Sequence, residues 1–206
     1  MAGKFITLEG IDGSGKSTQS QKISQWLESF TGLKTVRTFE PGGWPDGERL
    51  REFILSSKNF SSMSELLLFL ADRAEHVSRL ILPSLADGFN VVCERWNEST
   101  LAYQSGGHGL EVSVIERIIG ACEFPEPYAK IFLDVPPEIA FERVRLRNNH
   151  SDKFEAEGLS LMRKVSDSYR LMSDRFIHID CGEMSEDEIF WAIVERLEAK
   201  IHGDSD

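Results

Sequence analysis

Hydrophobic positions along the chain follow two patterns that alternate from one end to the other. Short apolar runs predict buried β-strands, and longer stretches with apolar residues every three or four positions predict amphipathic helices. The predicted strands are residues 5–8, 35–39, 90–93, 131–135 and 176–179. The predicted helices are residues 16–30, 50–55, 64–85, 112–122, 137–147, 152–174 and 186–201. Gly32 is the expected stop of the first helix, and Pro83 predicts a bend in the third.

Strands that alternate with helices are typical of parallel sheets joined by right-handed crossovers. We therefore expect an α/β fold with three layers, in which helices flank a five-stranded parallel sheet. Ligands of such folds bind at the carboxyl ends of the strands. The sequence shows no internal repeat or linker, so residues 1–206 are expected to form one domain. The polar segment at about 145–155 is either a short lid or a plain surface loop.

Charge and cysteine content narrow the classes of function. The net charge of −11 argues against broad binding to nucleic acid, which requires a basic face. The start of the chain has no signal-peptide pattern, and no apolar run is long enough to span a membrane, so we expect a cytoplasmic protein. The three cysteines are far apart and form no CxxC pair, so neither a disulfide framework nor a zinc site is expected.

Residues 10–17 read GIDGSGKS and match the phosphate-loop pattern G-x-x-x-x-G-K-[ST], between a predicted strand and a predicted helix. Glycines let successive backbone N–H groups turn toward phosphate oxygens, and the start of the helix adds its positive end. The lysine of this pattern contacts the β- and γ-phosphates, and the hydroxyl after it binds Mg²⁺. The residues expected at the triphosphate are Gly10, Ile11, Asp12, Gly13, Ser14, Gly15, Lys16, Ser17 and Thr18.

A charged segment directly follows the predicted strand at 90–93 and so lies at the same edge of the sheet. Glu94 is a candidate to hold Mg²⁺ or its water together with Ser17. Arg95 is a candidate to bind a substrate phosphate with its planar fork. The alternative for these two neighbours is a surface ion pair. The sequence has no N-K-x-D segment of the kind expected in a GTPase.

These motifs and several others resemble those of thymidylate kinases (dTMP kinases), in the family's order from Lys4 to about Asp180. The resemblance is carried by residues 5–13, 40–43, 94–96, 99–104, 133–138 and 152–155 and by Phe69 with Arg73. It implies the P-loop NTPase fold and the reaction ATP + dTMP → ADP + dTDP, with Mg²⁺ as cofactor and with ATP and dTMP as small-molecule substrates. It also implies a homodimer formed through the long helices.

By resemblance, one set of residues binds the acceptor dTMP. Asp12 contacts the 3′-hydroxyl side of the sugar, since a carboxylate beside a triphosphate needs a hydroxyl or a cation; the alternative is a turn role. Phe69 stacks on thymine and Arg73 binds a base carbonyl, whereas the alternatives are a core ring and a solvated helix charge. Gln104 contacts the thymine edge, and Tyr103 closes against the sugar. The full set is Asp12, Glu40, Pro41, Phe69, Arg73, Arg95, Ser99, Thr100, Tyr103 and Gln104.

The resemblance also implies which cations stabilise the transition state. One family arrangement has a basic residue inside the phosphate loop, where this chain has Gly13 and Ser14. The other has arginines in the lid, and it fits this sequence. The expected catalytic residues are Lys16, Arg95, Arg143, Arg145, Arg147 and Lys153. The chain departs from the family pattern at Phe39, Glu94 and Lys153, where Arg, Asp and Arg are usual. Arg37 is a candidate to replace the first of these.

Two other functions stay open: a kinase for another nucleoside monophosphate or a deoxynucleoside, and a non-enzymatic P-loop nucleotide switch. Phe69, Arg73 and Gln104 argue against the first. The acceptor motifs argue against the second, because a switch has no use for a second nucleotide site.

Overall fold

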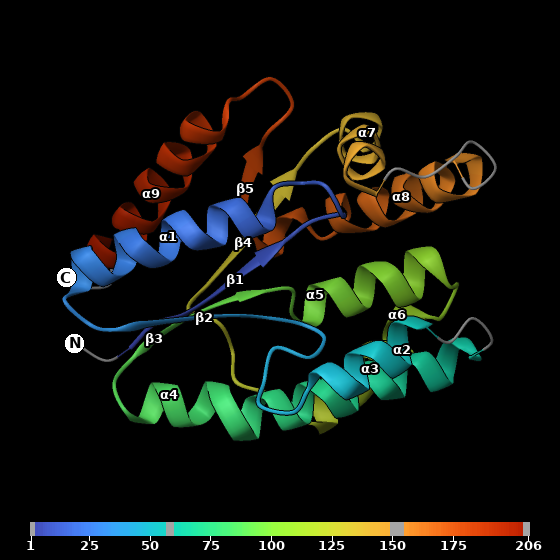
Figure 1. Ribbon diagram of the computed structural model, residues 1–206, viewed down its shortest axis with the longest axis horizontal. Helices are drawn as coiled ribbons and strands as arrows, with labels where there is room; N and C mark the ends of the chain where they lie inside the picture. Colours follow the sequence, from blue (N-terminus) through green and yellow to red (C-terminus); the bar gives the residue numbers. More distant parts are fainter. Residues whose placement is uncertain (1–2, 57–59, 149–154, 204–206) are drawn as a thin grey trace.

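Five parallel strands form one sheet in the order β2-β3-β1-β4-β5, which confirms the predicted sheet (Figure 1). The strands are β1 Phe5–Glu9, β2 Thr35–Phe39, β3 Asn90–Glu94, β4 Ala129–Asp134 and β5 Ile177–Asp180. The structure is a computed structural model that describes residues 3–56, 60–148 and 155–203. Leu8 of the central strand lies opposite Glu94 in β3, and Glu9 lies opposite Phe132 in β4. The strand order reverses at β1, so a crevice for ligands is expected at its carboxyl end.

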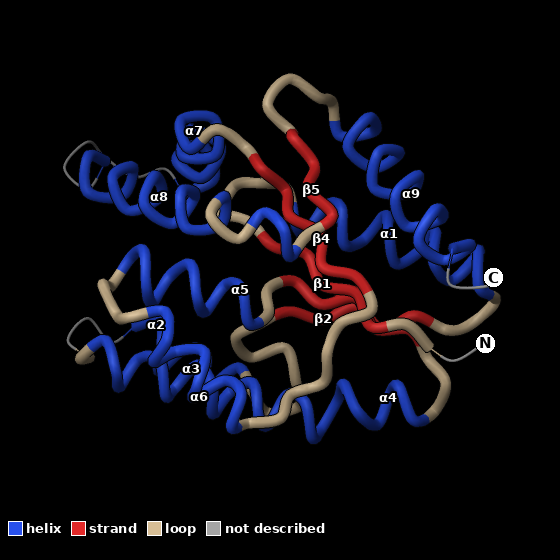
Figure 2. Tube along the Cα trace, turned by 180° about the vertical axis from the view of Figure 1, so that it is seen from behind, coloured by secondary structure: helices blue, strands red, loops and turns tan. Residues whose placement is uncertain are grey.

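Helices cover both faces of this sheet, which confirms the three-layer α/β fold. They are α1 Lys16–Thr31, α2 Glu48–Ser56, α3 Ser62–His76, α4 Leu82–Ala86, α5 Asn97–Thr100, α6 Val112–Ala121, α7 Pro137–Asn148, α8 Glu155–Arg170 and α9 Glu186–Gly203. Two π-helices, η1 Val77–Ile81 and η2 Leu101–Gly107, and the 3-10 turn η4 Ser173–Arg175 complete them. α1 lies beside α9 on one side of the sheet, and η1 with α4 lies on the other (Figures 1 and 2).

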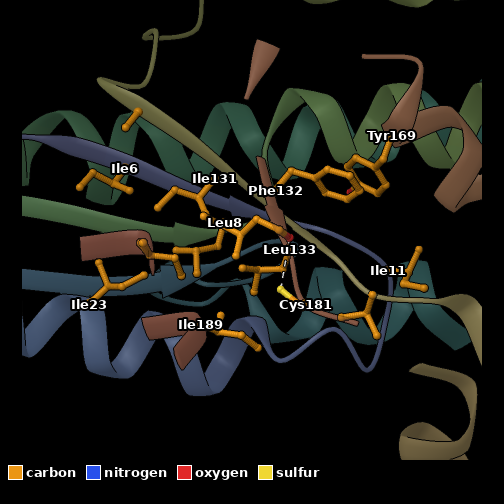
Figure 3. Packing of buried hydrophobic residues seen from close by; sticks show 14 of the residues in the cluster. Ile6, Leu8, Ile11, Ile23, Ile131, Phe132, Leu133, Tyr169, Cys181 and Ile189 are labelled. Carbon is orange, nitrogen blue, oxygen red and sulfur yellow. Dashed lines mark hydrogen bonds between the residues drawn. The ribbon is translucent and has the colours of Figure 1, made fainter. Parts of the chain in front are cut away.

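The main core lies between β1, β4 and the helices that cover them. Ile6, Leu8 and Ile131 are fully buried there. Figure 3 shows the ring of Phe132 pointing toward Tyr169 of α8, and the two rings stack with centroids 5.1 Å apart. Such a pair contributes about 0.5–1.5 kcal/mol beyond the burial of its surface. This contact holds α8 against the sheet, close to the carboxyl ends of the strands.

The helical stretch predicted at 64–85 is present, but its irregular turn does not lie at Pro83. α3 runs into the π-helix η1, where the N–H of Leu82 donates to the carbonyl of Val77. Pro83 stands in the first turn of α4, where its missing N–H costs little. A π-turn therefore lies immediately before the proline, and the bend near Pro83 stays a prediction.

The segment Asn97–Gly107 has no predicted element, yet it forms α5 and η2. Serine, threonine and two closing glycines make it a weak helix former. It is stabilised by packing against α8, so closely that a Cβ at Gly106 would lie 2.0 Å from Ser168 Oγ. Tertiary packing therefore forms this helix, which carries four of the residues expected at the acceptor.

The predicted helix at 152–174 is too long at its C-terminus. α8 ends at Arg170, where the N–H of Met172 donates to Tyr169 in a tighter three-residue turn. Residues 152–154 lie outside the described residues. The other predicted elements agree with the structure to within two residues at each end.

Cys93 and Cys181 are buried and Cys122 is exposed, and all three carry free thiols. Among the described residues, no helix combines the length and the apolar character that crossing a membrane requires.

Candidate active site

The phosphate loop lies between β1 and α1 and depends on glycine at two points. Gly15 has φ +94° and precedes the first residue of α1. Gly13 has φ +84° and lies so close to α7 that a Cβ would be 2.2 Å from the carbonyl oxygen of Ala140. Side chains strain both conformations, and at position 13 they also lack space. The loop can therefore turn its N–H groups toward an anion at the start of α1.

Lys16 is folded over the loop rather than extended into solvent. Its Nζ donates to the carbonyls of Gly10 at 3.0 Å and Ile11 at 2.8 Å and lies 3.4 Å from Ser14 Oγ. Burial, with the charge of Arg95, lowers the pKa of Lys16 from its usual 10.5 to about 7. A triphosphate beside this nitrogen would favour the ammonium form, since an opposite charge raises the pKa of a lysine.

The two residues expected at Mg²⁺ lie together. Ser17 Oγ donates to Glu94 Oε2 at 2.7 Å, and Ser20 Oγ donates to the other carboxylate oxygen at 2.8 Å. Glu94 is thus held at the end of β3 beside the first turn of α1. Hydroxyl and carboxylate oxygens are ligands that Mg²⁺ prefers, so this pair fits the ion.

Arg95 is held in an unusual backbone conformation, with φ +73°. Its guanidinium forms an ion pair with Asp12 at 2.6 Å and donates to Ser99 Oγ and Tyr103 Oη, both at 3.2 Å. The alternative of a surface pair with Glu94 is wrong, because that carboxylate bonds to the serines of α1. A residue other than glycine is strained in the left-handed region, and such strain often marks a functional position.

Asp12 is the carboxylate inside the phosphate loop. Desolvation of this carboxylate in the cleft would raise its pKa. The charges of Arg95 and Lys16 outweigh that effect and hold the pKa below its usual range. The carboxylate therefore stays ionised at neutral pH and accepts hydrogen bonds, as a contact with a sugar hydroxyl requires.

A cavity of about 300 Å³ opens beside Arg95, bordered by α2, α3 and η2. The residues expected at the acceptor all line it: Asp12, Glu40, Pro41, Phe69, Arg73, Arg95, Ser99, Thr100, Tyr103 and Gln104. Phe69 is only partly buried, so it is not a plain core residue. Their individual roles stay predictions.

Sequence reasoning missed four further residues that line this cavity: Arg51, Leu55, Glu65 and His108. Glu65 lies four residues before Phe69 and so shares its face of α3. Leu55 lies four residues after Arg51 and shares its face of α2. This spacing is a signal in the sequence that would have found Glu65. Arg51 and His108 lie on other segments, which only the folded chain brings to the cavity.

Arg73 is buried, so the alternative of a solvated helix charge is wrong. Its Nε donates to Glu40 Oε2 at 2.7 Å, and its Nη atoms donate to Asn97 Oδ1 at 2.9 Å and the Trp96 carbonyl at 3.0 Å. These bonds use three of the five N–H groups, which leaves donors for a ligand in the cavity that Arg73 lines.

A second cavity, of about 400 Å³, lies over the phosphate loop. It is lined by Asp12, Gly13, Gly15, Lys16, Ser17, Thr18, Arg37, Phe39, Glu40, Arg51, Glu94, Arg95 and Arg147. Ile11 is not among them, since its side chain packs in the core. Gly10 and Ser14 do not line this cavity either, and they contact Lys16 instead. Arg37 and Arg51 both bring positive charge to the part of this cavity that Phe39 lines.

The lid arginines of α7 differ in where they point. Arg143 Nη1 donates to the carbonyl of Gly13 in the phosphate loop at 3.3 Å. Arg147 lines the phosphate-loop cavity. Arg145 instead forms an ion pair with Glu142 on its own helix at 2.6 Å. Lys153 lies outside the described residues.

Glu9, another residue that sequence reasoning did not select, lies behind Arg95. Its fully buried carboxylate accepts from the Trp96 N–H at 2.7 Å, Ser99 Oγ at 2.5 Å and Tyr169 Oη at 2.9 Å. Burial, with the nearby charge of Glu98, raises the pKa of Glu9 to about 7. These bonds tie the loop that carries Arg95 to β1 and α8.

Known proteins resemble this chain over most of its length. The family model described as thymidylate kinase matches residues 8–189. A thymidylate kinase of Prochlorococcus marinus (strain AS9601) is 41% identical, over 84% of each chain. One of Carboxydothermus hydrogenoformans is 38% identical, over 96% of this chain and 98% of the relative. The crystal structure of thymidylate kinase from Ehrlichia chaffeensis has 28% identity and a TM-score of 0.78, over 96% of this chain and 99% of the other. The chain thus belongs to the thymidylate kinase family.

Proposed function

We propose that this protein transfers the γ-phosphoryl group of ATP to dTMP and releases ADP and dTDP. The observation that carries the proposal is a wall common to the two cavities, since Asp12, Glu40, Arg51 and Arg95 line both. An acceptor nucleotide in one cavity would have its phosphate at this wall, opposite the phosphate loop. Phosphoryl transfer is mainly positioning and charge stabilisation, so two adjoining sites with cations between them suit it.

Three cations have defined parts in the proposed reaction. Arg95 and Arg51 hold the acceptor phosphate, and one of its oxygens attacks the γ-phosphorus in line. Lys16 donates to the β- and γ-phosphate oxygens, where charge develops. A strong general base is not required, because a phosphate monoester is already anionic at neutral pH.

We place Mg²⁺ at Ser17 and Glu94, whose oxygens lie 2.7 Å apart beside the phosphate loop. When bound there, Mg²⁺ would neutralise part of the negative charge of the phosphates. The carboxylate of Glu94 keeps its position beside the first turns of α1 through Ser20 as well.

Base recognition is assigned to Phe69, Arg73 and Gln104. The partly buried ring stacks on thymine, the remaining guanidinium donors reach a base carbonyl, and the buried amide contacts the base edge. A methyl group in a pocket discriminates only about 10–200-fold. The preference for thymine over uracil is therefore expected to be moderate.

An assay of ADP release across nucleoside monophosphates tests the proposed function. We expect the highest kcat/KM for dTMP, with dUMP about 10–200-fold lower and purine nucleotides lower still. Preference for a purine monophosphate or a free deoxynucleoside would show that the acceptor is another molecule. ATP binding without acceptor-dependent ADP release would favour the nucleotide switch.

The three lid arginines are expected to differ in their effect on turnover. Arg143→Ala and Arg147→Ala should each lower kcat about a hundredfold, because both side chains reach the phosphate-loop side of the site. Arg145→Ala is the matched control and should stay within a few-fold, since Arg145 forms an ion pair with Glu142 on its own helix and lines neither cavity. Steady-state kcat at saturating ATP and dTMP is the measurement. Loss of no more than a few-fold in all three variants would refute a role of the lid arginines in catalysis.

We propose that two copies of the chain associate through α3 and α4. An exposed row runs along α3, η1 and α4 and consists of Leu67, Ala71, Ala74, Ser78 and Leu82. Small and apolar residues in a row let two helices approach closely, and burying them excludes water from apolar surface.

Light scattering after size exclusion tests the dimer. The wild type is expected at twice the chain mass of 23.3 kDa, and Ala71→Arg at the chain mass, because a charged side chain would be buried at the interface. Leu171→Arg, at a position 86% exposed at the end of α8, is the control and should remain dimeric. A monomeric wild type at micromolar concentration would contradict this assignment.

A further inference from the structure

The loop after β2 is held by a buried side-chain network centred on His76 of α3. His76 is fully buried, with Nδ1 3.0 Å from Glu40 Oε1 and Nε2 2.8 Å from Thr38 Oγ1. The hydroxyl of Thr38 donates to the carbonyl of Gly43 at 2.7 Å. One ring therefore joins α3, the end of β2 and the loop that follows it.

The hydrogen atoms of this network have a single consistent arrangement at Nε2 of His76. A carbonyl oxygen only accepts, so the one hydroxyl proton of Thr38 points at Gly43. Thr38 Oγ1 must then accept from the ring, which means that Nε2 carries a proton.

A second proton is required between Nδ1 of His76 and Oε1 of Glu40, because two acceptors without a proton would repel each other at 3.0 Å. The other oxygen of Glu40 accepts from the guanidinium of Arg73 at 2.7 Å, and a cation at this distance favours the ionised carboxylate. The proton therefore belongs to Nδ1. The charged groups around the ring are Arg73 and Asp72 of α3 and Glu40 of the loop, and the thiol of Cys93 faces it from β3. An imidazolium makes two cations beside two carboxylates, so the buried charges balance.

A metal ion is the competing explanation for this cluster, because ligand atoms of Glu40, His76 and Cys93 lie within 4.8 Å of one another. The donors do not suit one. Burial raises the pKa of the Cys93 thiol well above its usual range, and its S–H donates to the Arg95 carbonyl at 3.3 Å, whereas a metal requires the thiolate. Arg73 already occupies one oxygen of Glu40.

We propose that His76, as an imidazolium, is a positioning residue for the acceptor nucleotide. Its Nδ1–H orients Glu40, which in turn fixes the guanidinium of Arg73 at the acceptor cavity. Arg73 lines the acceptor cavity and not the one over the phosphate loop, Glu40 lines both, and His76 lines neither. The inference rests on the proposed acceptor site. It predicts that losing the Nδ1 donor impairs the use of dTMP and leaves the use of ATP nearly unchanged.

Two substitutions of His76 distinguish its hydrogen bond to Glu40 from its hydrogen bond to Thr38. The short amide of His76→Asn can replace Nδ1 as a donor to Glu40, whereas the longer amide of His76→Gln reaches toward Thr38 instead. We expect His76→Gln to raise KM for dTMP about tenfold, with KM for ATP within about twofold, because one buried hydrogen bond to a charged group is lost. His76→Asn should keep KM for dTMP within about threefold of the wild type. His202→Gln, on the exposed end of α9, is the matched control.

The protonation state is measured independently of activity by long-range ¹H–¹⁵N spectra of the wild type, with the His76 signals identified by their loss in either variant. Two protonated ring nitrogens at neutral pH support the proposal. A neutral ring, stoichiometric zinc in the purified protein, or an equal rise of both KM values in His76→Gln would overturn it. Absence of dTMP turnover in the wild type would refute the proposed function itself, whereas the spectra decide the state of His76 alone.

Discussion

Replacing Lys16 by methionine is expected to lower kcat about a thousandfold. Lys16 is the ammonium that the phosphate loop holds by the carbonyls of Gly10 and Ile11, at the start of α1. Methionine keeps the length of the apolar stem but has no donor for the phosphate oxygens, whose charge grows during transfer. Steady-state kcat with saturating ATP and dTMP is the measurement.

The same substitution elsewhere on α1 supplies the control. Lys22 lies on the same helix, and its ion pairs with Glu186 and Asp187 are on the surface. Lys22→Met should therefore leave kcat within about twofold, since surface pairs contribute little. The affinity for dTMP should be unchanged in Lys16→Met, because Lys16 does not line the acceptor cavity. A Lys16→Met enzyme that keeps a tenth of its kcat would contradict the assigned role.

Replacing Arg95 by alanine is expected to lower kcat/KM for dTMP about a thousandfold. Its guanidinium lies in the wall common to both cavities and forms the ion pair with Asp12 at 2.6 Å. In the proposed reaction it holds the acceptor phosphate in line with the γ-phosphate, so its loss affects both binding and positioning. Arg95→Lys keeps the charge without the planar fork, so its kcat/KM for dTMP should lie between the values of the wild type and Arg95→Ala.

The variant Arg95→Gly distinguishes the loss of catalysis from the loss of stability. With φ +73°, alanine remains strained there, whereas glycine does not. We expect Arg95→Gly to lose as much kcat/KM as Arg95→Ala but to be more stable than it by about 1 kcal/mol in urea unfolding. High activity in Arg95→Gly would show that the guanidinium is dispensable. Equal stability of the two variants would show that the backbone is not strained at this position.

The family and the phosphate loop could be predicted from local sequence because their physical causes are local. Gly13 and Gly15 are needed for positive φ within the loop itself, and Lys16 follows them at a fixed spacing. The strands are short apolar runs, so their bounds agree with the structure to within two residues. Parallel strands then bring Glu94 and Arg95 to the edge where the phosphate loop lies.

Several features of the candidate site were missed because their causes are not local. The helix Asn97–Gly107 forms against α8, despite its weak propensity. Arg51 reaches both cavities from α2, although nothing in its neighbourhood marks it as a site residue. Arg73 had two open interpretations, and only its bonds to Glu40 and Asn97 distinguish them.

The sequence by itself determined the order of strands and helices, the family and the phosphate loop, since each depends on periodicity or on motifs along a continuous segment. Only the tertiary structure decided the charge partners: Asp12 with Arg95, Glu40 with Arg73, and His76 between Glu40 and Thr38. These partners are separated by more than thirty residues along the chain. A buried polar group bonds to whatever the fold brings within about 3 Å of it, and hydrophobic patterning carries no information about that choice.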